Sequence, residues 1–444
     1  MANTLARGTH LLQKVGNKRL RVRQGSLRER SFQRVLSALR DRSAVSGFTH
    51  NYYRYPARFS PTFVRAVIEE FTKPGDTILD PFLGGGTTLV EGLALDRKVI
   101  GVDINPIAVF VSKVKSTPLD ECQLEQARKF AERYSSRGLA IHKSAASSKK
   151  DPRFLNTPWW LRGAINSILG QIEGIPDTEL RDFLQCGLLR TAQWALDCRA
   201  MIPESAAFVS TFQRNVDAMC GEMVAFCRGL GERRKSLLTS VRTRRCILHR
   251  SSMGLHLEHQ IPREWLPVKL VLTSPPYPGV HVLYHRWQVR GRRETPTPYA
   301  VIASPDGHAP SYFTLGGRHE AGLERYFRNL RECFSSVAPL MDKNALLVQL
   351  VSVGDQKSLL SRLKSSIEKA GFEPEKFRAS CRSTGVWRAV PNRKWYAPDG
   401  YACGRELLLL HRPRGQDGST MAPNSAVQLD SYLSSCPSSA GLWE

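Results

Sequence analysis

Thr77-Ile78-Leu79-Asp80-Pro81-Phe82-Leu83-Gly84-Gly85-Gly86-Thr87-Thr88 has the order of a buried strand, a glycine-rich loop and the first turn of a helix. A second run of β-forming residues, 98–102, ends at Asp103. In open α/β sheets, glycines at this place let the backbone approach a ligand at the helix start, and an acid at the end of the next strand accepts hydrogen bonds from ribose hydroxyls. The stretch therefore predicts a largely parallel sheet that binds a ligand at the carboxyl ends of its strands.

Two details of this loop distinguish it from a dinucleotide site. Leu89 stands where a third, close-packing glycine is expected, and Asp80 precedes the glycines. An acidic group ahead of the loop suits a ligand with a free ammonium and disfavours a pyrophosphate. S-adenosylmethionine carries that ammonium and has no phosphate, so we expect it to be the ligand. The alternative is a structural glycine turn with a solvent-facing acid.

A second candidate loop follows the apolar run 268–272 and reads Thr273-Ser274-Pro275-Pro276-Tyr277. A run of β-formers that stops at two prolines predicts a buried strand whose carboxyl end opens into a rigid loop. The loop offers a hydroxyl, two ring-locked backbone units and an aromatic face. These groups suit a flat ring that bears an amino group.

The composition of the chain points to a polyanionic partner. Its 444 residues are 41% hydrophobic, enough for one large core or a core with an inserted subdomain, and its formal net charge is +24. A charge this positive favours nucleic acid ahead of a membrane surface. No apolar run reaches the roughly 18 residues that span a bilayer, and the basic N-terminus lacks the apolar segment of a secretory signal. We therefore expect no membrane partner.

The spacing of cysteines and histidines predicts no metal site. The ten cysteines include no CxxC pair, which is typical of reduced thiols in a cytoplasm. His281 and His285 share one face of a helix-like stretch, 281–287, but no third ligand stands at a suitable spacing. We therefore expect a cytoplasmic protein without a bound metal.

The pattern of apolar residues divides the chain into five segments. Between the two sheet-forming halves, the apolar residues recur at helical spacing and the strand pattern stops. The segments are a basic N-terminal arm, the cofactor-binding part of the core, a helical insertion, the catalytic part of the core and a disordered tail, at 1–46, 47–117, 118–240, 241–414 and 415–444. Helices are expected near 31–39 and at 61–71, 323–340 and 359–370, and strands at 345–351 and 406–410.

The two loops together resemble those of the exocyclic-amine DNA methyltransferases, which make N4-methylcytosine or N6-methyladenine with S-adenosylmethionine. Tyr55-Pro56-Ala57-Arg58-Phe59 is similar to the family's cofactor-binding motif ahead of the glycine loop. The resemblance covers roughly residues 47–117 and 241–414. It implies a Rossmann-like methyltransferase fold, which is a mostly parallel seven-stranded sheet with a terminal antiparallel hairpin, here with a helical insertion.

The resemblance also implies roles for individual residues. Ser274 and the Pro275 carbonyl would accept hydrogen bonds from the target amine, Tyr277 would stack on the extruded base, and Pro276 belongs to the same catalytic loop. Asp80 would lie near the ammonium of the cofactor and Asp103 near its ribose. The full set of implied cofactor-binding residues is Tyr55, Pro56, Asp80, Pro81, Phe82, Gly84, Gly86, Thr87, Asp103, Ile104 and Asn105.

Basic and aromatic residues beyond the proline loop are the expected nucleic-acid contacts, because this composition suits phosphates and bases. They are His281, Arg286, Arg290, Arg292, Arg293, Arg393, Lys394 and Trp395. The segment that reads the target sequence is left open among the helical insertion, the loop 286–317 and the loop 381–402.

Ser274 favours cytosine N4 as the target, because members of the resembled family with serine here tend to be cytosine enzymes, whereas Asp or Asn is commoner for adenine. The resemblance implies a site-specific DNA methyltransferase of a restriction-modification or related system, acting at the nucleoid of a bacterium or archaeon. A separate cognate restriction endonuclease would be its partner. The alternatives are N6-adenine methylation, RNA amine methylation and a catalytically inactive nucleic-acid-binding protein.

Overall fold

The computed structural model describes residues 24–56, 58–137, 151–231, 237–279, 286–291, 293–306, 314–353, 357–375, 385–389 and 405–414. The described residues up to Pro413 form one compact unit, which includes all of their helices and strands. Among these described residues, none of the helices combines the length and the apolar character needed to cross a membrane.

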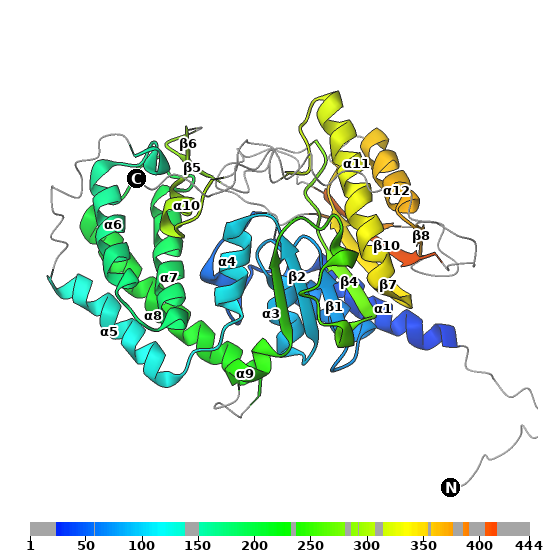
Figure 1. The fold of residues 1–444 in the computed structure, drawn as a ribbon, viewed down its shortest axis with the longest axis horizontal. Helices are drawn as coiled ribbons and strands as arrows, with labels where there is room; N and C mark the ends of the chain where they lie inside the picture. Colours follow the sequence, from blue (N-terminus) through cyan, green and yellow to red (C-terminus); the bar gives the residue numbers. More distant parts are fainter. Residues whose placement is uncertain are drawn as a thin grey trace, which may run out of the picture. The chain divides into compact units, whose positions relative to one another are not determined.

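An eight-stranded sheet forms the core of the unit (Figure 1). The strands follow the order β3-β2-β1-β4-β7-β10-β8, and β9 also pairs with β10. The strands β3, β2, β1, β4 and β7 run parallel to one another. Strand β10 runs antiparallel to its neighbours β7, β8 and β9. The strands are β1 (Thr77–Asp80), β2 (Lys98–Asp103), β3 (Arg245–His249), β4 (Val268–Thr273), β7 (Met341–Val351), β8 (Phe372–Pro374), β9 (Gly385–Ala389) and β10 (Arg405–Pro413).

Apolar side chains on both faces of the sheet explain why it lies between two layers of helices. Ile78 and Leu270 face α1 (Gln24–Arg40) and α2 (Pro61–Phe71). Their neighbours in the chain, Leu79 and Val271, belong to the opposite cluster with α11 (Glu320–Val337) and α12 (Lys357–Lys369). Successive side chains of a strand point to opposite faces, so a strand buried on both faces must be apolar throughout.

The order of the strands places the two candidate loops side by side. The chain builds outward from β1 through β2 to β3 and then returns to β4, which pairs with the other edge of β1. Ligands of open α/β sheets bind where the strand order reverses in this way, outside the carboxyl ends of the strands. The glycine loop follows β1 and the proline loop follows β4, so both lie at this reversal.

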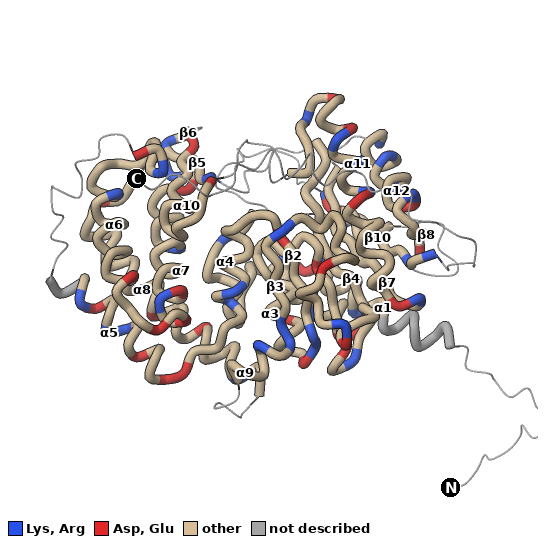
Figure 2. Tube along the Cα trace, in the orientation of Figure 1, with Lys and Arg blue, Asp and Glu red and all other residues tan. Residues whose placement is uncertain are grey.

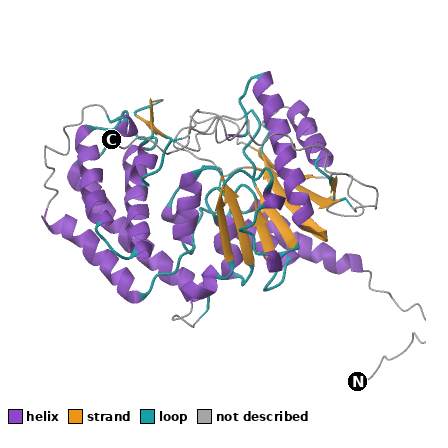
Figure 3. Cartoon of the chain, in the orientation of Figure 1, coloured by secondary structure: helices purple, strands orange, loops and turns teal. Residues whose placement is uncertain are grey.

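A separate part of the chain is built from helices alone, as the purple helices beside the strands in Figure 3 show. All the apolar stripes expected for this segment are buried, including Ile165, Leu188 and Met219. The helices that precede, form and follow it are α3 (Thr87–Ala94), α4 (Pro106–Lys115), α5 (Glu121–Arg137), α6 (Trp159–Glu173), α7 (Thr178–Leu196), α8 (Ser205–Gly229) and α9 (Leu237–Arg242). We call α5 to α8 the helical lobe.

A hairpin from the second sheet-forming half of the chain packs into the helical lobe. Strands β5 (Trp287–Val289) and β6 (Arg293–Thr295) pair antiparallel and lead into α10 (Thr297–Val301). Val289 pairs with Arg199, which follows α7, and the amide of Cys198 donates to the Gln288 carbonyl at 2.6 Å. Trp287 is buried in the same apolar cluster as the helices of the lobe. The chain therefore crosses into the lobe a second time.

The structure confirms most of the expected elements and corrects two. Helix α2 has the expected bounds, and α1 includes the expected helix at 31–39. The helices expected at 323–340 and 359–370 correspond to α11 and α12, which end at Val337 and Lys369, and residues 338–340 form a 3-10 turn. The helix expected through 287 is wrong at its end, because Trp287 belongs to a strand. The expected terminal antiparallel hairpin is present as β9 and β10, but among the described residues the sheet has eight strands instead of seven, since β8 also pairs with β10.

Candidate active site

The glycine loop adopts a conformation that two of its residues permit only as glycine. Gly84 and Gly86 have φ of 49° and 74°, in the left-handed region that favours glycine. A Cβ on Gly86 would lie 2.5 Å from the Ser112 hydroxyl oxygen, which α4 holds against the loop. Thr87, the first residue of α3, is buried immediately behind the loop. The loop therefore presents its backbone, without side chains, at the start of a helix.

Two carboxylates flank this loop at the ends of β1 and β2. Asp80 is buried, and its Oδ1 accepts hydrogen bonds from the Thr273 hydroxyl at 2.8 Å and the Phe82 amide at 3.2 Å. Asp103 accepts from the Gly84 amide at 2.7 Å and the Asn105 amide at 2.8 Å. Burial raises the pKa of each carboxyl to about 6, against the hydrogen bonds that lower it. Both groups are mainly ionised at neutral pH and available to a cation or to hydroxyls.

Aromatic residues close the side of the site next to Asp103. Tyr55 packs against Gly84 and Gly85, and its hydroxyl accepts from the Asn105 amide nitrogen at 3.0 Å. Asn105 also caps α4 by accepting from the Ile107 amide, while Tyr299 of α10 donates to the same side-chain oxygen at 3.4 Å. The structure thus joins Tyr55 and Asn105, which the sequence separates by 50 positions.

The remaining cofactor-binding candidates lie around the same loop. Phe82 is partly buried and meets Phe334 of α11 edge to face, with ring centroids 6.1 Å apart. The carbonyl of Pro81 accepts from the Ser252 hydroxyl at 2.5 Å, and the carbonyl of Ile104 contacts the His249 ring at 3.1 Å. Pro56 is partly buried one residue after Tyr55.

The proline loop contacts the glycine loop directly. The hydrogen bond from Thr273 to Asp80 joins residues 193 positions apart and fixes the end of β4 beside the end of β1. Of the four catalytic candidates, Pro275 is buried, whereas Ser274, Pro276 and Tyr277 are partly exposed. The two motifs that the sequence analysis singled out therefore form one site.

Three residues outside the predicted set hold the proline loop. The Tyr326 hydroxyl of α11 donates to the Pro276 carbonyl at 2.5 Å. The Tyr277 hydroxyl donates to Glu406 of β10 at 2.6 Å, and Arg388 of β9 donates to the other oxygen of Glu406. Glu406 could have been noticed in the sequence, because it is a single acid immediately before a run of four leucines in a predicted strand. Tyr326 and Arg388 carry no comparable signal.

The described basic candidates lie on the hairpin that packs into the helical lobe. Arg290 and Arg293 are exposed on either side of its turn. Arg286 instead forms ion pairs with Asp306 at 2.7 Å and Glu294 at 3.7 Å, so its charge is already balanced. His281, Arg292, Arg393, Lys394 and Trp395 lie outside the described residues. Figure 2 shows lysines and arginines interspersed with acids over both the sheet and the helical lobe.

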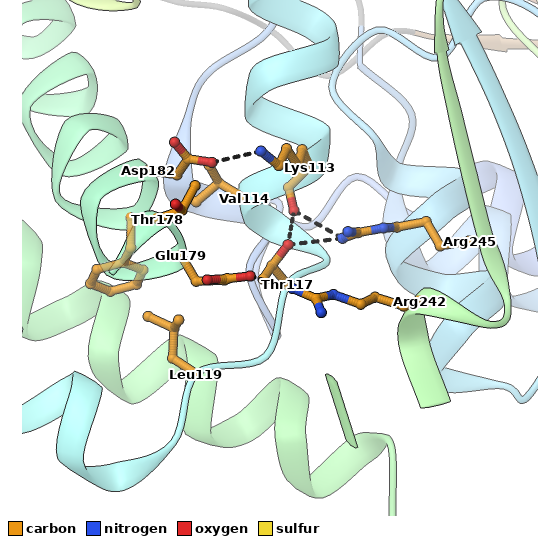
Figure 4. Close-up of a pocket in the computed structure, with 10 residues that line it drawn as sticks. Lys113, Val114, Thr117, Leu119, Thr178, Glu179, Asp182, Arg242 and Arg245 are labelled. Carbon is orange, nitrogen blue, oxygen red and sulfur yellow. Dashed lines mark hydrogen bonds and ion pairs between the residues drawn. The ribbon is translucent and has the colours of Figure 1, made fainter. Parts of the chain in front are cut away.

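A hollow of about 380 Å³ between α4, α7, α9 and β3 is a different feature (Figure 4). It lies at the carboxyl end of α4 and the start of β3. The glycine loop lies at the opposite, carboxyl ends of the parallel strands. Its cations are engaged, since Lys113 pairs with Asp182 at 2.8 Å and Arg242 with Glu179 at 2.5 Å. The side chain of Arg245 donates to the Thr117 hydroxyl at 2.9 Å. The hollow takes no part in the candidate active site.

The strand order is that of a Rossmann-like methyltransferase fold, with the two loops at its ligand-binding position. Residues 13–113 match a family model described as DNA methylase, N6_N4_Mtase. Type II methyltransferase M.MvaI of Kocuria varians is 34% identical over 142 residues, which cover 31% of this chain and 31% of that protein. Type II methyltransferase M.BsoBI of Geobacillus stearothermophilus is 48% identical over 68 residues, or 15% and 13% of the two chains. DNA adenine methyltransferase YhdJ of Escherichia coli (strain K12) is 33% identical over 73 residues, or 16% and 25%.

The part of the chain that matches the N4/N6 DNA methylase family is residues 13–113. The matched stretches span about a third or less of the relatives named above. Among solved structures, TrmN from Thermus thermophilus aligns at a TM-score of 0.30 and 11% identity over 80% of this chain and 49% of that one. The rRNA methyltransferase aviRa from Streptomyces viridochromogenes aligns at 0.28 and 10%, over 84% and 92%. Scores this low add nothing to the fold assignment, which rests on the strand order.

The cofactor of this family is S-adenosylmethionine, and the residues present fit it. The glycine loop carries no side chains at 84–86, and a Cβ at Gly86 would collide with Ser112. Two ionised carboxylates, Asp80 and Asp103, stand on either side of that loop as acceptors for an ammonium and for ribose hydroxyls. A carboxylate ahead of the glycine loop would repel a pyrophosphate, whereas S-adenosylmethionine has no phosphate.

Proposed function

We propose that this protein is a site-specific DNA methyltransferase that transfers a methyl group to the exocyclic N4 amine of cytosine. The observation that carries the proposal is the hydrogen bond between Thr273 and Asp80, which fixes Ser274-Pro275-Pro276-Tyr277 beside the cofactor loop. A methyl donor and an amine-binding loop at one sheet edge are the two parts that such a reaction requires.

The chemistry assigned to the proline loop follows from the weakness of the target amine as a nucleophile. Its lone pair is delocalised into the base ring, so acceptors that draw its hydrogens out of the ring plane make the lone pair available. Ser274 and the Pro275 carbonyl are the acceptors we propose. S-adenosylmethionine, when bound, supplies a methyl group on a positively charged sulfur, and holding the amine in line with it contributes most of the remaining rate enhancement.

A base inside a duplex cannot reach a loop at the edge of a sheet, so the proposal includes extrusion of the target base. Tyr277 would replace part of the stacking that the base loses. Asp80 would bind the ammonium of the cofactor and Asp103 its ribose, with Tyr55, Ile104 and Asn105 around the adenine.

We assign the reading of the DNA to the helical lobe together with the hairpin β5–β6. Arg290 and Arg293 are exposed at the turn of that hairpin, where they are available to phosphates. Alanine at both positions should weaken DNA binding and flatten its dependence on salt, measured by fluorescence anisotropy from 50 to 200 mM salt. Alanine at Lys343, an exposed lysine of β7, is the matched control.

Adenine N6 is the second candidate function, favoured by the match to DNA adenine methyltransferase YhdJ of Escherichia coli. Mass spectrometry of nucleosides from DNA treated with the purified protein separates the two candidates. We expect N4-methylcytosine, and its loss with Ser274→Ala by about 100-fold or more in rate. N6-methyladenine without N4-methylcytosine would overturn the cytosine assignment.

The genetic setting follows from the same proposal. Several relatives are type II methyltransferases by name, so we propose a separate restriction endonuclease with the same recognition sequence as the partner. Methylation-sensitive sequencing of cells with and without this gene would report the base and the sequence together. Unchanged methylation after deletion of the gene would contradict the proposal.

A further inference from the structure

A buried acid lies behind the proline loop, at the start of β10. Glu406 is 5% exposed and both of its carboxylate oxygens are engaged. Oε1 accepts from the Tyr277 hydroxyl at 2.6 Å, and Oε2 accepts from Arg388 Nε at 2.8 Å and from its terminal nitrogen at 2.5 Å. Glu406 and Arg388 are direct partners across the antiparallel ladder between β10 and β9.

Stability alone does not account for this pair. Arg388 is 7% exposed, so both charges have been removed from water. The desolvation of such a pair offsets much of its attraction, and well-packed apolar residues of similar size are often as stabilising. A charged pair at the back of a candidate catalytic loop therefore calls for an explanation in terms of what the carboxylate does to Tyr277.

The chemistry of these groups fixes the direction of each hydrogen bond. A guanidinium only donates hydrogen bonds and an ionised carboxylate only accepts them. The Tyr277 hydroxyl must therefore be the donor in its hydrogen bond to Glu406. The Tyr277 oxygen in turn accepts a hydrogen bond from the Ser274 hydroxyl at 3.4 Å. Because the Ser274 hydroxyl donates its hydrogen to Tyr277, the lone pairs of its oxygen can accept a hydrogen bond from a bound ligand.

This direction matters because a serine hydroxyl has one hydrogen to donate and two lone pairs to accept with, and that hydrogen must point away from the target amine. The exocyclic amine of a base presents N–H donors, so the serine must accept. We propose that Glu406, held by Arg388, is a positioning residue that sets the direction of the hydrogen bonds through Tyr277, so that Ser274 offers its lone pairs to the target amine. The inference rests on the proposed function of the proline loop and deepens it.

Two substitutions test the inference. Tyr277→Phe keeps the aromatic ring for stacking and removes only the hydroxyl. Glu406→Gln keeps the size of the side chain but adds an N–H donor, which allows the direction of the bonds to reverse. We expect each to lower kcat by about tenfold to a hundredfold, with the KM for DNA and the Kd for S-adenosylmethionine within about twofold of the wild type.

Matched controls come from buried groups of the same kind elsewhere in the chain. Tyr52→Phe removes the hydroxyl of another buried tyrosine, which donates to the Met219 carbonyl at 2.8 Å. Glu91→Gln neutralises another buried acid, which accepts from Arg65 at 2.8 Å. Both should leave kcat within about twofold of the wild type. If Glu406→Gln fails to fold, the double variant Glu406→Met with Arg388→Met replaces the pair by apolar residues and should show the same loss of kcat.

The decisive measurement is the double variant Tyr277→Phe with Glu406→Gln. If Glu406 acts through the Tyr277 hydroxyl, the double variant should be no slower than Tyr277→Phe alone. Independent, multiplying losses would show that Glu406 has only a structural role and would overturn the inference, as would wild-type kcat in either single variant. A wild-type protein that methylates no nucleic acid would refute the proposed function instead, so the two failures are distinguishable.

Discussion

Replacing Lys115 by methionine should remove a pH dependence of stability that the wild-type protein shows near neutrality. Lys115, the last residue of α4, is 1% exposed, and its Nζ donates to the carbonyl of Gly85 at 2.8 Å. Burial, with a smaller effect from the nearby Arg58, lowers the pKa of Lys115 to about 7. The lysine therefore changes charge in the folded protein at a pH where it stays fully charged in the unfolded chain.

The sign and size of the effect follow from proton linkage. An unfolded lysine has a pKa near 10.4, so between pH 7 and pH 10 the unfolded chain binds more protons than the folded protein. The free energy of unfolding then rises with pH, and the part due to Lys115 grows by about 1 to 1.5 kcal/mol between pH 6 and pH 8. Below pH 6 both states are protonated and the slope from this residue vanishes.

Urea denaturation at pH 6, 7 and 8 measures this slope directly. Lys115→Met should show a smaller rise in the free energy of unfolding than the wild type, by about 1 kcal/mol or more over this range. Lys113→Met is the control, because Lys113 lies on the same helix with a half-exposed side chain that pairs with Asp182. Equal slopes for the wild type and Lys115→Met would refute the account of Lys115 as a lysine that loses its proton in the folded state.

Three further outcomes follow from the geometry. Gly86→Ala should lower the free energy of unfolding by about 2 to 4 kcal/mol in urea denaturation, because the backbone there is left-handed and a Cβ would overlap Ser112. Gly170→Ala is the control: it lies in open space on α6 and should raise the free energy of unfolding by about 0.5 to 1 kcal/mol. Asp103→Asn should weaken S-adenosylmethionine binding by about tenfold or more in calorimetry, and unchanged affinity would remove this residue from the cofactor site. Trp287→Ala should cost about 3 to 5 kcal/mol in thermal or urea unfolding, whereas a loss below 1 kcal/mol would contradict its burial in the helical lobe.

The sheet and the adjoining loops were predictable because their signals are local. The strands at 77–80 and 268–273 are short runs of β-formers, and glycine or proline ends each of them. The glycines at 84 and 86 have the left-handed conformations that only glycine adopts readily. In each case a few consecutive residues determine the backbone, so one sequence is enough to recognise it.

The contacts that complete the site were not predictable in this way. Glu406 meets Tyr277 across 129 positions of sequence, and Tyr299 meets Asn105 across 194. The choice of partner depends on which elements the fold brings together, and periodicity carries no information about that. The pairing of Arg286 with Asp306 and Glu294 shows the same limit, since a cluster of arginines in sequence does not reveal which members are already neutralised.

The hairpin β5–β6 limits how this protein could be re-engineered. Arg199 and Cys198, at the end of α7, bond to its backbone, and the Trp287 indole donates to the Tyr53 hydroxyl at 2.9 Å. The helical lobe therefore cannot be exchanged as one continuous segment, because it also contacts a hairpin from a later part of the sequence. A chimera that exchanges residues 118–240 alone would leave the hairpin facing a foreign surface. A graft that keeps these contacts has to carry residues 286–306 with the lobe, as two inserts in one exchange.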